Sequence, residues 1–222
     1  DISYDPFFTL MQGNSVQGFS GTCGIIASCN MVNQQTGSRL TEADGVAAFT
    51  AADICSGDGG TSTENRECFI RSKNLQFEAV EQDWIEENTP GLPGQELEEV
   101  ARRFREGESV MISVMAEDLS QDELFSRDVD PEFQMEVLLR ILEDPESVPA
   151  EDQIAAFYPG LRDHMVSVAG FSYAQDGSVT GLWINDTGGW ASLITNRIFL
   201  SAEKYNLMKE ATRGFSVEFV KK

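Results

Sequence analysis

The spacing of apolar residues changes along this chain, and that change most constrains what the chain can fold into. In the N-terminal half, apolar side chains recur every three or four residues, which predicts helices at residues 22–34, 41–54, 64–73 and 94–106. Other runs alternate apolar and polar residues, which predicts strands at residues 75–80, 109–115, 164–171, 179–186 and 215–220. Residues 191–200 are expected to be extended and residues 202–209 helical. Helices first and an antiparallel sheet later make an α+β layout.

The chain is strongly acidic, with 37 acidic and 16 basic residues and a formal net charge of -21. A nucleic-acid-binding protein needs cationic residues to displace phosphate counterions, so we expect no nucleic-acid partner. The charge also disfavours an anionic membrane surface, and no apolar run approaches the roughly 18 to 20 residues of a membrane span. Acidity would attract a basic partner, but by itself it mostly favours solubility.

The N-terminal residues lack the basic start and apolar run of a signal peptide, and the chain does not begin with Met. These features suggest a mature form or a domain excised from a longer protein. They favour a secreted or delivered effector over a cytoplasmic protein.

Residues 117–163 differ in character from the rest of the chain. Residues 116–163 hold fourteen acidic residues and three basic ones, with helices expected at residues 131–142 and 150–158. The segment separates a predicted core strand from the next predicted strand. We therefore expect one domain over residues 1–222 with an acidic helical insertion at about 117–163. The insertion is either a cap or partner-binding face, or a solvated helical excursion.

The cysteine and histidine content limits the metal and redox chemistry that the chain can support. There are four, with no CxxC pair and only one histidine in the chain, so we expect neither a metal site nor a cofactor. Cys55 and Cys68 flank a polar, glycine-rich stretch. They can close a disulfide across that loop, or stand as two unpaired thiols.

His164 must serve any mechanism that needs an imidazole, because the chain has no other histidine. A hairpin centred near Gln175 would set His164 opposite Asp186, and such directly opposed side chains lie about 4.5 to 5.5 Å apart at Cβ. An aspartate there would accept the ring Nδ1–H, fix the tautomer and stabilise the imidazolium. A slip of one residue would bring Asn185 in instead. The alternative is an ordinary ion pair at a strand end.

Cys23 is the candidate nucleophile. It lies in the segment QGFSGTCG, in the first turn of the helix predicted at residues 22–34, with Thr22 or Ser20 as its cap. Unpaired N–H groups and the partial positive charge of a helix N-terminus favour a thiolate there. Gly24 would leave room for a substrate carbonyl, and the Gln17 amide could join the Cys23 N–H in binding an oxyanion. Cys29, in mid-helix on an apolar face, is expected to be core.

A glutamine, five residues, then Cys-Gly at a helix start, followed by a late histidine strand and an Asn/Asp strand, resembles the papain-like cysteine peptidases. The segment QGFSGTCGIIASCNMV is most similar to the double-glycine leader peptidases that trim bacteriocin precursors and to their stand-alone bacterial relatives. Their third catalytic residue is an aspartate in a strand ending like WINDTGG, which favours Asp186 over Asn185. The resemblance covers about half the chain.

The resemblance implies a papain-like fold, with the cysteine at a helix start in the N-terminal part and His and Asp on a C-terminal antiparallel sheet. It assigns Gln17 to the oxyanion hole, Cys23 as nucleophile, His164 as general base and acid, and Asp186 as the residue that orients His164. The acidic insertion and the polar stretch around Cys55 and Cys68 depart from the family pattern, so leader-peptide specificity is not carried over.

Three functions stand as hypotheses. The first is a cysteine peptidase that cleaves a peptide or isopeptide bond of a protein or peptide substrate through an acyl-enzyme. The second is a toxin or effector domain that uses the same residues for glutamine deamidation or acyl transfer, with an immunity protein or other partner on the acidic insertion. The third is a degenerate, non-catalytic binding module.

Overall fold

The computed structural model describes residues 21–57, 59–81, 92–115, 163–186, 196–211 and 215–222. The chain divides into two units, residues 1–114 with 164–222, and residues 115–163. The second unit lies almost entirely outside the described residues, so the two helices expected within the acidic insertion stay predictions. Cys23, His164 and Asp186 all belong to the first unit.

Helices and strands combine in this unit, which confirms the predicted α+β class. The helices are α1 (Cys23–Thr36), α2 (Glu42–Ala51), α3 (Thr63–Ser72), α4 (Leu97–Arg105) and α8 (Ala202–Ala211). The strands are β1 (Gln76–Glu81), β2 (Ser109–Met115), β3 (Asp163–Tyr173), β4 (Val179–Asp186), β5 (Asn196–Ser201) and β6 (Ser216–Lys221). Each lies within a few residues of its predicted position. No helix in the described ranges is long and apolar enough to span a bilayer.

The six strands form one sheet in the order β1-β6-β2-β3-β4-β5. The pairs β1/β6, β2/β6, β3/β4 and β4/β5 are antiparallel. The last strand of the chain therefore lies between the first two. Spacing along the sequence predicts β6 as a strand but says nothing of its place in the sheet.

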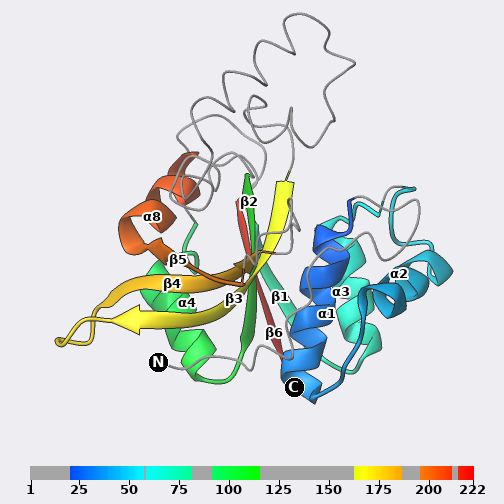
Figure 1. The fold of residues 1–222 in the computed structure, drawn as a ribbon, viewed down its shortest axis with the longest axis horizontal. Helices are drawn as coiled ribbons and strands as arrows, with labels where there is room; N and C mark the ends of the chain where they lie inside the picture. The colour runs from blue at the N-terminus through cyan, green and yellow to red at the C-terminus, as the bar shows by residue number, and fades with distance from the viewer. Residues whose placement is uncertain (1–20, 58, 82–91, 116–162, 187–195, 212–214) are drawn as a thin grey trace, which may run out of the picture. The chain divides into compact units, whose positions relative to one another are not determined.

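Helices cover both faces of the sheet. Helices α1, α2 and α3 pack together on one face, and α4 and α8 lie on the other (Figure 1). The core on the α1 side joins apolar side chains of the three helices to those of the sheet, among them Ile25, Cys29, Phe49, Phe69, Phe77, Met111, Met165 and Val220. Cys29 is fully buried, as predicted.

The ends of α1 and α2 are explained by the local sequence. Gly37 adopts a left-handed φ of 74° at the C-cap of α1, which is favourable for glycine, and its N–H donates to Asn33 O at 2.8 Å. Thr41 and Asp44 form the predicted capping box of α2. Thr22 is the N-cap residue of α1, but its side chain does not cap the helix. The Thr22 hydroxyl instead donates to Glu42 Oε1 at 2.9 Å and ties α1 to α2.

The β3/β4 hairpin differs from its predicted register. Val166, not His164, is directly opposite Asp186. The turn runs from Ala174 to Ser178, closed by the Ala174 N–H donating to Ser178 O at 2.9 Å, with Gly177 at a φ of 87°. This turn centres the hairpin about one residue later than predicted, and the cross-strand partners are shifted by two or three residues.

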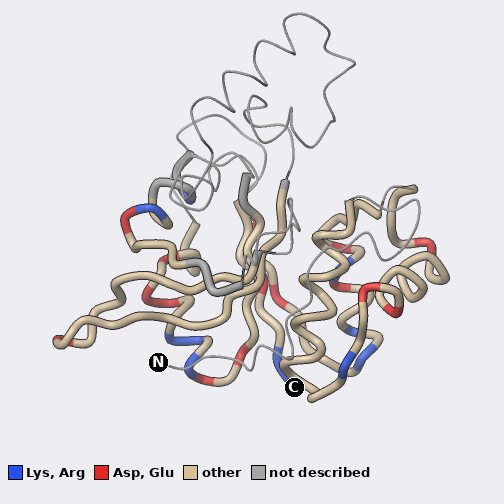
Figure 2. The backbone as a smooth tube through the Cα atoms, in the orientation of Figure 1, with Lys and Arg blue, Asp and Glu red and all other residues tan. Residues whose placement is uncertain are grey.

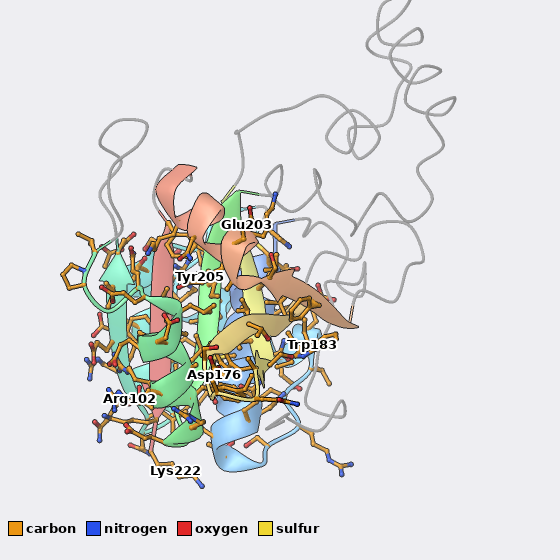
Figure 3. The ribbon with its side chains drawn as sticks, turned by 90° about the vertical axis from the view of Figure 1, so that its left-hand side faces the viewer. Arg102, Asp176, Trp183, Glu203, Tyr205 and Lys222 are labelled. Atoms are coloured by element: carbon orange, nitrogen blue, oxygen red, sulfur yellow. The ribbon has the colours of Figure 1, made fainter. Side chains whose placement is uncertain are left out.

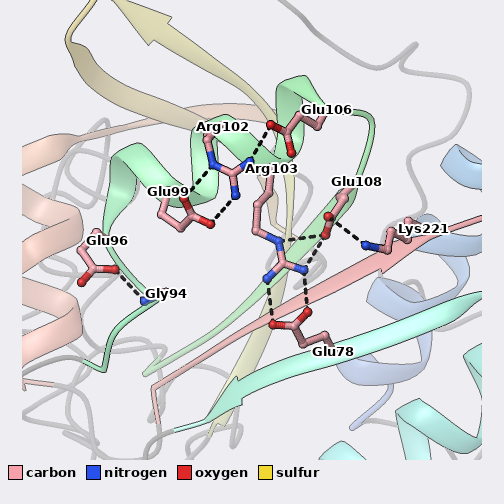
Figure 4. Close-up of polar contacts among 9 residues, drawn as sticks. All are labelled: Glu78, Gly94, Glu96, Glu99, Arg102, Arg103, Glu106, Glu108 and Lys221. Carbon is pink, nitrogen blue, oxygen red and sulfur yellow. Dashed lines mark hydrogen bonds and ion pairs between the residues drawn. The ribbon is translucent and has the colours of Figure 1, made fainter.

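Helix α4 lies on the opposite face and places three arginines in its last turn, seen as blue segments in Figure 2. The Arg103 guanidinium stacks on the Phe219 ring at 3.5 Å and donates to Glu78 and Glu108 (Figure 4). Tyr205 of α8 (Figure 3) is buried on the same side. Its hydroxyl donates to Gln95 O at 2.6 Å. These contacts tie α4 to β1 and β6 and tie α8 to the segment before α4.

Candidate active site

Cys23 and His164 are brought together by the fold. Cys23 is the first residue of α1, and His164 is the second residue of β3. Their side chains are hydrogen-bonded to each other. The thiol is half-buried and the histidine is 7% exposed, so the pair is shielded but reachable from solvent. Two of the four residues predicted for the site are therefore in contact, and their roles as nucleophile and base stay predictions.

The surroundings of Cys23 favour its thiolate. Burial, the largest single influence, raises the pKa of the thiol, but the hydrogen bond and the charge of His164 lower it. The backbone N–H groups of Met165 and Gly24 also donate to the sulfur. The net result is a Cys23 pKa below that of an ordinary thiol. An anionic sulfur stabilised in this way is a stronger nucleophile at neutral pH than a free thiol.

The start of α1 adds to this effect. No acidic residue lies in the first turn, so nothing there offsets the partial positive charge of the helix end. The Thr22 hydroxyl, which would commonly cap the helix, is engaged with Glu42. The backbone N–H of Gly24 is thereby left to the Cys23 sulfur rather than competing with a side-chain cap.

Gly24 has a packing role that the sequence did not predict. A Cβ built on Gly24 would lie 2.1 Å from Thr61 Oγ1 and 3.5 Å from Arg66 Cδ. The space into which a Gly24 side chain would point is thus filled by the Thr61 side chain. Glycine is needed here because the loop before α3 packs directly on the backbone of α1.

The observed register of β3 and β4 locates Asp186 and Asn185 relative to His164. Val166 and Ser167, as successive residues of β3, point to opposite faces of the sheet. Residue 186 is opposite Val166 and residue 185 is opposite Ser167. Ser167 faces α1, because its hydroxyl accepts from Asn30 Nδ2 at 3.1 Å.

Asp186 is therefore a diagonal neighbour of His164, not its direct partner. Diagonal neighbours lie about 7 to 8 Å apart, within reach of longer side chains. The Asp186 side chain lies outside what the structure describes, so its contact with His164 stays a prediction.

The remaining predictions concern Gln17, the other cysteines and metal binding. Gln17 lies outside the described residues, so its place in the oxyanion hole stays a prediction. The described part of the chain includes all four cysteines, and all four are free thiols, with Cys55 half-buried and Cys68 exposed. Of the two alternatives for Cys55 and Cys68, the structure has the unpaired one. Within the described ranges, no cluster of three His, Cys, Asp or Glu side chains could hold a metal ion.

Arg66 of α3 and Glu218 of β6 form an ion pair that the sequence patterns did not reveal. They are 5% and 0% exposed, and the Arg66 guanidinium interacts electrostatically with Cys23. One signal was available. Arg66 precedes Phe69 and Ile70 by three and four residues, which places it on the apolar face of α3. Glu218 likewise stands between apolar neighbours in the strand SVEFVK.

Comparisons with known proteins add no assignment. No model of a known protein family matches the sequence, and no curated protein is significantly similar to it. The case for a function therefore depends on the site alone.

Proposed function

We propose that this protein is a cysteine peptidase of the papain-like superfamily, related to the double-glycine leader peptidases, that hydrolyses a peptide or isopeptide bond. Cys23 is the nucleophile, His164 the general base and acid, and Asp186 the residue that orients His164. The observation that carries the proposal is the hydrogen bond between Cys23 and His164 at the start of α1. A histidine and a cysteine that share a hydrogen bond form the minimal unit of thiol catalysis.

In the first half of the reaction, the Cys23 thiolate attacks the carbonyl carbon of the substrate and a C–S bond forms. The carbonyl oxygen becomes an oxyanion, which the Cys23 backbone N–H and the Gln17 amide would stabilise. The His164 imidazolium then donates its proton to the leaving nitrogen. The C–N bond breaks, and a thioester on Cys23 and a free amine result.

In the second half, water replaces the amine. Neutral His164 takes a proton from water as its oxygen attacks the thioester carbon. The C–S bond breaks, the acid product leaves, and the Cys23 thiolate is restored beside the His164 imidazolium. The same thioester would form from a glutamine side chain with release of ammonia, so the identity of the leaving amine separates peptidase from deamidase activity.

The depressed pKa of Cys23 gives the direct test. We would alkylate the protein briefly with iodoacetamide, and separately with an epoxysuccinyl probe, from about pH 4 to about pH 9, a range that brackets the free-thiol pKa of about 8.5. Mass spectrometry of the digested protein would then give the rate at each cysteine. We expect Cys23 to react selectively, with a midpoint well below about 8.5. Cys68, which is exposed, serves as the internal control.

The His164→Ala variant supplies the matched control. Without the imidazole, the alkylation midpoint of Cys23 should rise towards or above that of an ordinary thiol. Burial raises the pKa of Cys23, and His164 would no longer lower it. Hydrolysis of a peptide library should fall about a thousandfold or more in both Cys23→Ala and His164→Ala. A wild-type Cys23 that reacts slowly with an ordinary midpoint would favour the non-catalytic binding module and end this proposal.

A further inference from the structure

A fully buried ion pair lies beside the first turn of α1. Arg66 Nε donates to Glu218 Oε2 at 3.1 Å and to Oε1 at 3.2 Å, and Arg66 Nη2 also donates to Oε1. Glu218 lies on β6 in the interior of the sheet and is 0% exposed. Val220, two residues along the strand, packs in the core with α1, so Glu218 faces the same side.

Stability alone is a poor explanation for this pair. Removing two charges from water costs more than their attraction commonly returns, and apolar replacements of buried ion pairs are often neutral or stabilising. Burial opposes the charge on Arg66, yet the charge and hydrogen bonds of Glu218 raise the pKa of the guanidinium, so it stays cationic. A permanent buried cation next to a nucleophilic thiol calls for a functional explanation.

The other N–H groups of the Arg66 guanidinium bind Thr61 and Thr63, in the segment that leads into α3 and contacts α1. Nη1 donates to Thr61 O at 2.9 Å and to Thr61 Oγ1 at 3.2 Å, and Nη2 donates to Thr63 Oγ1 at 3.2 Å. Thr61 Oγ1 and the Arg66 Cδ atom are the groups that a Cβ on Gly24 would meet. Arg66 thus fixes Thr61 against Gly24. The Gly24 backbone N–H in turn donates to the Cys23 sulfur.

Charged groups reach this region from several elements. His164 of β3 and Arg66 of α3 act directly on Cys23. Glu218 of β6 and Glu81 of β1 interact electrostatically with Arg66. Glu42 of α2 accepts a hydrogen bond from the hydroxyl of Thr22, the residue before Cys23. Of the two cations, only Arg66 keeps its charge when His164 loses its proton.

We propose that Arg66 is a positioning residue for Cys23: anchored by Glu218, it holds Thr61 against Gly24, fixes the first turn of α1 and supplies a buried positive charge near the thiolate. This inference rests on the proposed function of Cys23 but concerns different residues. It predicts that the reactivity of Cys23 depends on a side chain that touches neither the substrate nor the sulfur.

The test compares three variants with the wild type by the pH dependence of Cys23 alkylation and by thermal unfolding. The double variant Arg66→Met with Glu218→Leu replaces both charged side chains by apolar ones of similar volume, which should preserve the fold. Arg103→Met is the matched control, because Arg103 is also a buried arginine held by two carboxylates but lies on the α4 face. Thr61→Val removes only the hydroxyl, at a half-buried position.

We expect the alkylation midpoint of Cys23 to rise by roughly half a unit or more in the double variant, since a nearby opposite charge moves a pKa by about 1 to 3 units. The rate of epoxysuccinyl labelling at neutral pH should fall several-fold. Thr61→Val should lower that rate in the same direction by a smaller factor. Arg103→Met should lower the melting temperature and leave the Cys23 midpoint unchanged.

Two results would overturn the inference. One is a folded double variant, or a folded Thr61→Val protein, with the wild-type midpoint and labelling rate. The other is an equal shift in Arg103→Met, which would mean that any loss of packing disturbs Cys23. If the wild-type midpoint is itself that of an ordinary thiol, the proposed function fails first, so the two failures are distinguishable.

Discussion

The thiol of Cys23 and the imidazole of His164 are hydrogen-bonded, although one begins the first described helix and the other lies in the strand that comes after the acidic insertion. The contact exists because α1 packs against β3 on one face of the sheet. Asn30, two turns after Cys23, donates to Ser167 of β3 and holds the two elements in this alignment. Any change that loosens α1 from β3 should therefore act on the reactivity of Cys23 as well as on stability.

The proposed role of Asp186 in orienting His164 can be tested by comparing two neighbouring positions. Asp186 is the diagonal neighbour of His164, while Asn185 is opposite Ser167. We expect Asp186→Asn to lower kcat/KM for a peptide substrate by about a hundredfold or more, because the imidazolium would lose its carboxylate partner. Cys23 should still be alkylated.

Asn185→Ala is the matched control and is expected to lower stability more than turnover, since residue 185 is buried. If Asn185→Ala lowers kcat more than Asp186→Asn does, Asp186 does not orient His164.

Two glycines pack where a methyl group has no space. A Cβ on Gly24 would lie 2.1 Å from Thr61 Oγ1, and one on Gly45 would lie 2.7 Å from both Cys29 Sγ and Ile25 Cγ2. Each alanine substitution should cost about 1 to 3 kcal/mol of unfolding free energy through overpacking. Gly24→Ala should also slow epoxysuccinyl labelling of Cys23, whereas Gly45→Ala should not.

Gly57→Ala is the control for both, because a Cβ there meets nothing within 4 Å. Chemical denaturation of the three variants provides the measurement. Equal stability of Gly24→Ala and Gly57→Ala would show that Thr61 does not press on α1.

The thiols should differ sharply in accessibility. Burial, with a smaller contribution from the charge of Asp44, raises the pKa of Cys29 to about 12, and its side chain is 0% exposed. We expect Cys29 to react with iodoacetamide at neutral pH about a hundredfold or more slowly than the exposed Cys68, since only the thiolate attacks. Denaturant should abolish the difference. Rapid labelling of native Cys29 would mean that α1 opens locally from α2.

Arg103 should matter more for stability than its neighbour Arg102. Arg103 stacks on Phe219 and donates to the buried Glu108, whereas Arg102 bridges the exposed Glu99 and Glu106 (Figure 4). Arg103→Met should lower the unfolding free energy by about 2 to 4 kcal/mol, because a buried carboxylate would lose its main partner.

Arg102→Met, the same chemical change at a solvated site, should cost at most about 1 kcal/mol. Urea denaturation of both variants measures the contrast. Similar losses in the two proteins would show that the Glu108 carboxylate finds enough compensation from Lys221, 3.5 Å away.

The sequence was sufficient for the type and approximate position of each described helix and strand. Residues at a spacing of three and four define α1, and the capping box of Thr41 and Asp44 starts α2, because such signals act within one or two turns. Cys23 and His164 could also be singled out, since a lone histidine and a cysteine at a helix start are properties of the sequence itself.

Tertiary structure alone decided what the sequence could not. The turn at Gly177 moved Asp186 from direct to diagonal opposition with His164, because register depends on turn geometry that composition does not specify. Thr61, Arg66 and Glu218 meet beside Gly24 only because β6 inserts between β1 and β2. Local patterns predict which elements form, whereas long-range packing determines which side chains surround the thiol.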